Sequence, residues 1–89
     1  MRITVEISMY PLRENYEPAI FEFIQKVKQV EGLIVKANPT ATHIFGEYNL
    51  VFSTLNSEIK RSFETYGKAV FAMKVLSGDL ENSLDGKNL

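Results

Sequence analysis

The sequence has no cysteine, no tryptophan, no excess of charge of either sign and no long hydrophobic run. Without cysteine there is no disulfide, no thiolate metal site and no Cys nucleophile, a composition typical of a reducing cytoplasm. Ten basic and eleven acidic residues give a formal net charge of -1, so no strong field attracts nucleic acid or an anionic membrane. No segment has the pattern of a signal peptide or membrane span. We therefore expect a cytoplasmic protein with neither kind of partner.

The residues that are present indicate one small globular domain. The chain of 89 residues is 45% hydrophobic and 24% charged, which is the balance of a folded soluble protein. A chain of this size hides only roughly 60 to 65% of its unfolded surface, so self-association is expected to supply further burial. We predict one domain over residues 1–76, followed by a polar and frayed tail over residues 77–89.

Hydrophobic periodicity predicts a strand and then a helix in the first third of the chain. Residues 3–9 alternate between apolar and polar side chains, as in a half-buried strand, and Pro11 ends the run. Apolar residues then recur at steps of three and four between residues 15 and 31, which is typical of an amphipathic helix. Asn15 is the expected N-cap, Pro18 fits the first turn, and Gly32 ends the helix.

The remaining patterns predict a hairpin, a second helix and a last strand. Residues 33–38 and 40–45 are rich in strand formers and are separated by Asn38 and Pro39, a turn-forming pair. Residues 48–66 have helical periodicity and end at Gly67, and residues 69–76 form the last predicted strand. The order β-α-β-β-α-β predicts an α+β, ferredoxin-like fold, in which two helices cover one face of a four-stranded antiparallel sheet.

In this predicted fold the other face of the sheet has no helices over it. Ala41, His43 and Phe45 are expected there, beside Thr4, Glu6 and Ser8. A second sheet packed on this face would explain an apolar ring at position 45. We therefore expect a homodimer, formed through the open face or through the sheet edges, which could assemble further into a higher oligomer.

The residues themselves favour no enzymatic or RNA-binding role. An RNA-recognition surface needs exposed aromatic and basic residues on the central strands, and here there are few. An acylphosphatase-like site would need a glycine-rich anion cradle beside Arg13, and residues 9–15 contain no glycine. His43 is the only histidine and belongs to no metal-binding spacing. We expect no catalysis, no metal and no cofactor.

Two short motifs resemble the YkoF-like thiamine-binding family. The first is Glu-Ile-Ser-Met-Tyr-Pro-Leu over residues 6–12, and the second is Thr-His-Ile-Phe-Gly over residues 42–46, followed by Leu50, Val51 and Phe52 at the start of a helix. The resemblance covers roughly residues 2–76. It implies ferredoxin-like domains, paired in tandem or as dimers, that bind thiamine or its hydroxymethylpyrimidine precursor without chemistry.

The resemblance also implies ligand contacts. It points to Met9 and Thr42, and a Thr hydroxyl beside an adaptable Met side chain is compatible with an aminopyrimidine. Thr42 shares its strand face with Ile44, which predicts a pocket between the sheet and the helices. Proximity adds Ser8, although it points to the other side of its strand. The thiazolium charge of thiamine adds further candidates, which are Glu6, Tyr10, Tyr16, Glu47 and Tyr48.

Other interpretations of the same residues stay open. Met9 is equally suited to the core, and the Thr42 hydroxyl could bond a neighbouring carbonyl. Phe45 stands where the family often has a charged residue. One alternative function is a regulatory or interaction domain with an empty pocket, and another is a dimeric α+β barrel enzyme, such as a small monooxygenase or isomerase, that uses His43.

Overall fold

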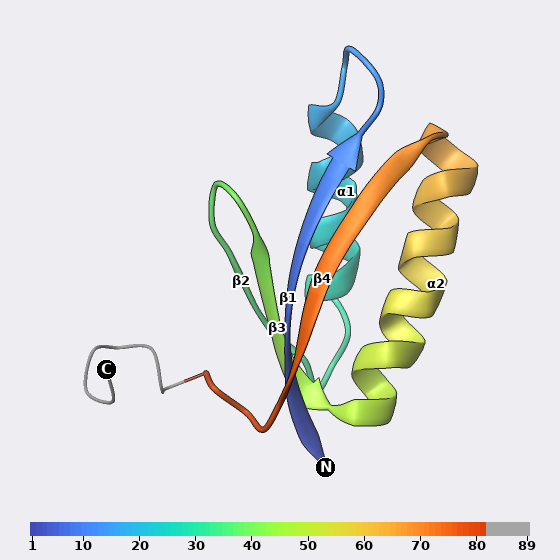
Figure 1. Cartoon of the computed structure of the whole chain (residues 1–89). Helices are drawn as coiled ribbons and strands as arrows, with labels where there is room; N and C mark the ends of the chain where they lie inside the picture. The colour runs from blue at the N-terminus through green and yellow to red at the C-terminus, as the bar shows by residue number, and fades with distance from the viewer. Residues whose placement is uncertain (82–89) are drawn as a thin grey trace.

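The computed structural model describes residues 1–81, which form one four-stranded sheet and two helices (Figure 1). The elements follow the predicted order. They are β1 (Arg2–Pro11), α1 (Glu17–Lys28), β2 (Ile34–Ala37), β3 (Thr42–Glu47), α2 (Tyr48–Tyr66) and β4 (Ala69–Ser77). All neighbouring strands are antiparallel, in the spatial order β2-β3-β1-β4. The predicted ferredoxin-like α+β fold is confirmed.

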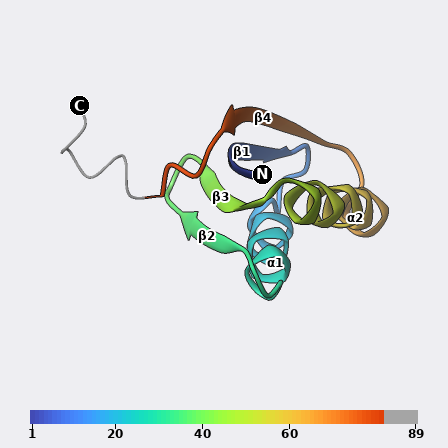
Figure 2. The same ribbon diagram turned by 90° about the horizontal axis from the view of Figure 1, so that it is seen from below.

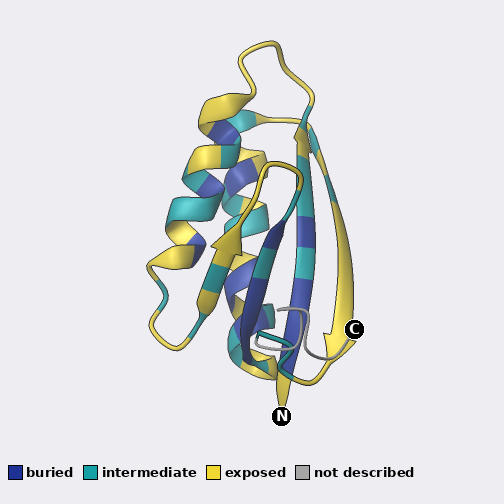
Figure 3. Cartoon of the chain, turned by 90° about the vertical axis from the view of Figure 1, so that its left-hand side faces the viewer, coloured by how far each residue is buried: buried dark blue, intermediate teal, exposed yellow. Residues whose placement is uncertain are grey.

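Both helices lie on the same face of the sheet (Figure 2). The alternation of β1 directs Ile3, Val5 and Ile7 toward them, as period-two patterning requires. These side chains pack with residues of α1, β3 and α2 in one core, whose other members are Phe23, Val27, Ile44, Val51 and Leu55. The central strands are therefore the most buried, whereas β2 and β4 are largely exposed (Figure 3).

The first helix is shorter than the sequence pattern predicts. Its N-cap is Tyr16, which makes no side-chain capping bond, so the prediction of Asn15 as the cap is wrong. Pro18 lies in the first turn, as expected. The helix ends at Lys28, before the predicted boundary, because Gln29 and Val30 continue as a tighter turn that leads to Gly32, whose φ is 98°.

The hairpin is offset from its predicted position. β2 covers only Ile34–Ala37, and β3 begins at Thr42 and continues through Gly46 to Glu47. Gly46 is needed because of close packing rather than backbone freedom. A Cβ atom there would lie 2.5 Å from Cδ2 of Leu33 and 3.3 Å from Cγ2 of Val51, so this glycine lets β3, α2 and the start of β2 approach one another.

The chain after β4 folds back over the open face of the sheet. The Thr4 hydroxyl donates to the Gly78 carbonyl at 2.9 Å and accepts from the Leu80 amide at 2.9 Å. Phe45 is only 3% exposed, and it lines a hollow together with Leu80 and Glu81. Phe45 is therefore already buried within a single chain, beside the segment that follows β4. Of the predicted tail, Ser77 is the last residue of β4, residues 78–80 are tied to Thr4 by these hydrogen bonds, and residues 79–81 are half-buried. The rest of the tail lies outside the described residues.

Candidate functional site

Met9 and Thr42 meet at a small cavity between the sheet and α1. Ile7 and Met9 contribute from β1, and Thr42 contributes from the start of β3, where its register partner is Ile7. The other lining residues come from α1 and from the tip of the β2–β3 hairpin: Ile20, Phe23, Ile24, Asn38, Pro39, Thr40 and Ala41. The predicted location between the sheet and the helices agrees with this geometry.

The cavity has apolar walls from β1 and α1 and a more polar side at the hairpin, where Asn38, Thr40 and Thr42 line it. Its volume is about 70 Å³, compared with roughly 300 to 1,000 Å³ for pockets that hold drug-sized ligands. Thr42 is 6% exposed, and within residues 1–81 no side-chain hydrogen bond involves its hydroxyl. Among residues 1–81, the buried side-chain polar atom that lacks a partner is Ser62 Oγ on α2. The Thr42 hydroxyl instead keeps contact with solvent at the cavity, where it can pair with a ligand.

The hairpin tip is held by hydrogen bonds on both of its sides. The Asn38 side-chain oxygen accepts from the backbone amides of Thr40 at 3.2 Å and Ala41 at 3.0 Å. Since that oxygen is occupied, the Asn38 amide nitrogen keeps its two donors for other partners. From the open face, Ser8 Oγ donates to the Thr40 carbonyl at 3.0 Å. Ser8 therefore positions a segment of the cavity wall from the opposite side of the sheet.

Glu6 and Tyr10 lie on the open face of β1, away from the cavity. Glu6 is opposite His43 on one neighbouring strand and Lys74 on the other. Its carboxylate lies 3.4 Å from His43 Nε2 and 3.8 Å from Lys74 Nζ. Tyr10 is exposed near the end of the strand. His43 is therefore part of a surface pair and does not line the cavity between sheet and helices.

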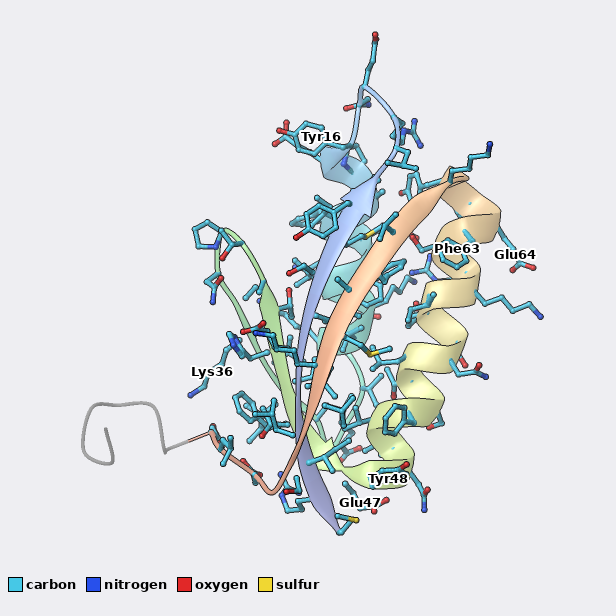
Figure 4. The ribbon with its side chains drawn as sticks, viewed as in Figure 1. Tyr16, Lys36, Glu47, Tyr48, Phe63 and Glu64 are labelled. Atoms are coloured by element: carbon cyan, nitrogen blue, oxygen red, sulfur yellow. The ribbon has the colours of Figure 1, made fainter. Side chains whose placement is uncertain are left out.

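Glu47 lies at the opposite end of the sheet from Met9. It pairs with Arg2, at the start of β1, seven residues from Met9 and so about 23 Å away along an extended strand. Its carboxylate caps α2 by accepting from the Asn49 amide at 3.0 Å. Figure 4 shows Glu47 and Tyr48 together at this end, and Tyr16 at the other. The structure thus brings Met9 and Thr42 together, with Ser8 behind them, but not Glu47.

Sequence reasoning missed the contribution of the hairpin tip and of α1. Asn38 and Pro39 are readable as a turn, but nothing in their pattern shows that the turn folds toward Met9. Ile20 and Ile24 belong to the apolar stripe of α1, which predicts that they face the sheet. Only the structure shows that they are half-buried and line a cavity.

The described residues also bear on metal binding and on membrane spanning. Residues 1–81 contain no cluster of three or more His, Cys, Asp or Glu side chains arranged to hold a metal ion. Within the same residues, neither helix has the length and apolar character needed to cross a bilayer.

The sequence of residues 2–80 matches the model of a family described as the YKOF-related family. The chain belongs to the YKOF-related family. This match extends slightly beyond residues 2–76, the stretch that the resemblance covers, and it includes every lining residue of the cavity. None of the curated protein sequences matches the chain.

Several solved structures resemble this member of the family. A protein of Streptococcus pneumoniae has a TM-score of 0.80 at 16% identity, over 90% of each chain. A candidate thiamine biosynthesis/salvage protein of Thermotoga maritima has a TM-score of 0.78 at 18% identity, over 88% of this chain and 85% of that one. A hypothetical protein of Methanocaldococcus jannascii has a TM-score of 0.76 at 16% identity, over 88% and 81%. At these identities the likeness demonstrates a common fold.

Proposed function

We propose that the protein binds thiamine through its hydroxymethylpyrimidine moiety, or that moiety alone, and does no chemistry on it. The observation that carries the proposal is the shared cavity of Met9 and Thr42, which are the two residues that the family resemblance marks as ligand contacts. The family match supports the proposal, as does the name of the Thermotoga maritima protein, which refers to thiamine biosynthesis or salvage.

The lining of the cavity suits a flat, neutral heteroaromatic ring. Aliphatic side chains of α1 and β1 offer apolar contact to the ring faces, and Met9 can adapt its shape. An aminopyrimidine has an amino donor and ring nitrogen acceptors. The Thr42 hydroxyl can donate or accept, and the Asn38 amide nitrogen donates, so the two match a ring edge that carries both kinds of group.

The charged half of thiamine would lie outside this cavity. No carboxylate lines the cavity among the described residues, so a thiazolium ring would lose hydration there without gaining a counter-charge. A second hollow on the outer side of α1 shares Ile20 and Ile24 with the cavity and includes Glu17. We therefore place the pyrimidine in the cavity and the thiazolium toward Glu17.

Entry of the ring requires the hairpin tip to move outward. A volume of about 70 Å³ holds about two water molecules at roughly 30 Å³ each, which is less than a substituted pyrimidine needs. The wall formed by residues 38–41 belongs to an exposed loop, whereas the walls from β1 and α1 belong to the core. The hydrogen bond from Ser8 to Thr40 is one restraint on this movement.

Titration calorimetry with hydroxymethylpyrimidine, thiamine and thiamine phosphate tests the proposal. Thr42→Val should weaken binding of each ligand about 10-fold, which corresponds to roughly 1.4 kcal/mol for one lost buried hydrogen bond. Thr54→Val is a matched control, because Thr54 is also buried but lies on α2 outside the cavity. We expect that variant to bind as the wild type does.

The outcomes separate the site from the function. Absence of heat and of thermal stabilisation with all three ligands, at concentrations well above the micromolar range, would reject the proposed function. Binding that Thr42→Val leaves unchanged would reject the site and retain the function.

A further inference from the structure

We propose that the hollow beside Phe45, on the open face of the sheet, is a second ligand site, and that it takes a small zwitterion with an apolar side chain, of the chemical class of an α-amino acid. This hollow and the Met9–Thr42 cavity lie on opposite faces of the sheet, and Asn38 is the one lining residue that they share. The proposal does not rest on thiamine binding. It follows from the size of the hollow, its apolar base and the charges at its rim.

The hollow has the size of a small-molecule site. Its volume is about 380 Å³, which lies within the roughly 300 to 1,000 Å³ of pockets that hold drug-sized ligands. Its walls come from β2, β3 and the segment after β4, through Lys36, Ala37, Asn38, His43, Phe45, Leu80 and Glu81. Apolar surface combined with a few polar groups is typical of a ligand site.

Hydrogen bonds fix the segment after β4 as one wall of the hollow. The Thr4 hydroxyl accepts from the Leu80 amide at 2.9 Å, and Arg2 Nε donates to Asp79 Oδ2 at 2.7 Å. The other oxygen of Asp79 accepts from the Glu81 amide at 3.1 Å. The backbone that carries Leu80 and Glu81 is therefore held in place, and both side chains line the hollow.

The base of the hollow offers apolar contact. The rings of His43 and Phe45 are nearly parallel, at 16°, and their centroids lie 6.4 Å apart. Phe45 is almost completely buried beneath the hollow, whereas Ala37, His43 and Leu80 are more exposed and present most of the surface that a ligand would touch. An apolar side chain of a ligand would lose contact with water on this base.

Two opposite charges lie at the rim of the hollow. Lys36 projects from the open face, because its register partner on β3 is His43, and Figure 4 shows it pointing away from α2. Its Nζ atom lies 3.7 Å from Glu81 Oε2 and 5.9 Å from the centroid of the Phe45 ring. A ligand above that ring would therefore meet an ammonium group and a carboxylate together.

The balance of charge determines the class of ligand. Lys36 and Glu81 contribute one charge of each sign, and the neighbouring Glu6 carboxylate already lies 3.4 Å from His43 Nε2 and 3.8 Å from Lys74 Nζ. A simple anion would be attracted by Lys36 and repelled by Glu81, and a simple cation would meet the reverse. A zwitterion can place its carboxylate beside Lys36 and its ammonium group beside Glu81.

The ion pair between Lys36 and Glu81 can open at little cost. Their side chains are 55% and 24% exposed, and an ion pair in such a setting contributes little to stability. A zwitterion that separates the two groups gives each a new partner of opposite charge, and burial of its apolar side chain adds to the binding.

Three related ligands test the class. L-Phenylalanine carries both charges and a ring, phenethylamine lacks the carboxylate, and 3-phenylpropionate lacks the ammonium group. Each is titrated at pH 7 and millimolar concentration while the amide NMR signals of the protein are followed. We expect L-phenylalanine to shift the signals of residues 36–38, 43–45 and 80–81, and to bind about 10-fold more tightly than the other two.

Three variants test the location. Lys36→Gln and Glu81→Gln each remove one charge from the rim, and each should weaken binding of L-phenylalanine about 10-fold. Lys60→Gln is the matched control, because Lys60 is also exposed but lies on α2, and it should bind as the wild type does.

Each adverse result removes a defined part of the proposal. Absence of any shift with L-phenylalanine would overturn the site. Equally tight binding of phenethylamine or 3-phenylpropionate would overturn the zwitterionic class. Affinity that both Lys36→Gln and Glu81→Gln leave unchanged would overturn the location.

Discussion

β2 and β4 are the two outer strands of one sheet, and their edges differ in length, composition and use. β2 is four residues long, carries Lys36, and is followed by Pro39 at the hairpin tip. β4 is nine residues long and mostly apolar. The short strand makes the hairpin tip that closes the Met9–Thr42 cavity, whereas the long strand offers an unprotected ladder. The two edges therefore differ within the described residues: β2 leads into the hairpin tip that lines the cavity, and β4 leaves the outer side of its backbone unpaired.

Alanine substitutions at Gly46 and Gly67 compare how tightly the chain is packed beside β2 and before β4. The first should give the largest loss of stability among the predictions made here. Gly46→Ala should lower the free energy of unfolding by about 1 to 3 kcal/mol, because the new methyl group would overlap Leu33, just before β2. Gly67 precedes β4 and has a φ of 86°, with nothing within 4 Å of a Cβ atom. Gly67→Ala should cost about 1 kcal/mol, from backbone strain alone. Urea denaturation measures both.

An equal loss of unfolding free energy in Gly46→Ala and Gly67→Ala would contradict the view that the chain is packed more tightly beside β2 than before β4. Leu33→Ala provides a further check, because it removes the Cδ2 atom that a Cβ atom at position 46 would overlap. In that background Gly46→Ala should lower the free energy of unfolding by less. The same truncation should not change the cost of Gly67→Ala.

Thr4 tests whether the segment after β4 is held on the open face. Its hydroxyl bridges Gly78 and Leu80, so Thr4→Val removes two hydrogen bonds worth about 0.5 to 1.5 kcal/mol each. We expect faster amide hydrogen exchange in residues 78–81 and a loss of about 1 to 3 kcal/mol in the free energy of unfolding. Ser8→Ala is the control, because Ser8 holds the hairpin tip instead, and its faster exchange should occur in residues 38–41. Unchanged exchange at Leu80 in Thr4→Val would show that the bridge does not hold the segment.

Periodicity predicts the element order and the core because both depend on local patterns. The alternation in β1 and the three-and-four spacing in α1 each show which side chains are buried before any tertiary contact is known. Met9 and Thr42, the two residues to which the family resemblance points, line the same cavity. Boundaries at Asn15 and Gly32 are less accurate, because helix ends depend on the turns that follow them.

Contacts between distant segments could not be predicted from the pattern. Leu80 lines the same hollow as Phe45 because the polar segment after β4 folds back over the sheet. Nothing in the sequence of residues 77–81 specifies that direction. The placement of Glu47 is similar: its sequence position beside the second motif suggests a ligand contact, but the geometry of the strand-to-helix junction uses its carboxylate as a cap. Glu47 is only five residues from Thr42, but β3 runs between them, so the two residues lie at opposite ends of the sheet.

The smallest expected change in stability comes from the polar contact between α1 and α2. Glu22 of α1 accepts hydrogen bonds from Tyr66 and Arg61 of α2, so α1, over the cavity, is tied to α2, beside β4. The Tyr66 hydroxyl, followed by Arg61, holds the pKa of Glu22 below its ordinary value of 4.5. The Arg2 guanidinium does the same for the pKa of Asp79.

These lowered pKa values determine the sign of the pH dependence. A carboxyl whose pKa is lower in the folded protein stabilises the fold fully above its unfolded pKa, and that stabilisation is lost as the pH falls through the folded pKa. At pH values below about 4.5, the melting temperature should therefore decrease as the pH decreases. Glu22→Gln should melt lower at pH 7 and show a shallower fall toward pH 3, whereas Glu64→Gln, exposed on α2, should follow the wild type. If both variants kept the wild-type slope, Glu22 would not couple the two helices, and the cavity side and the β4 side of the molecule would be joined through the core alone.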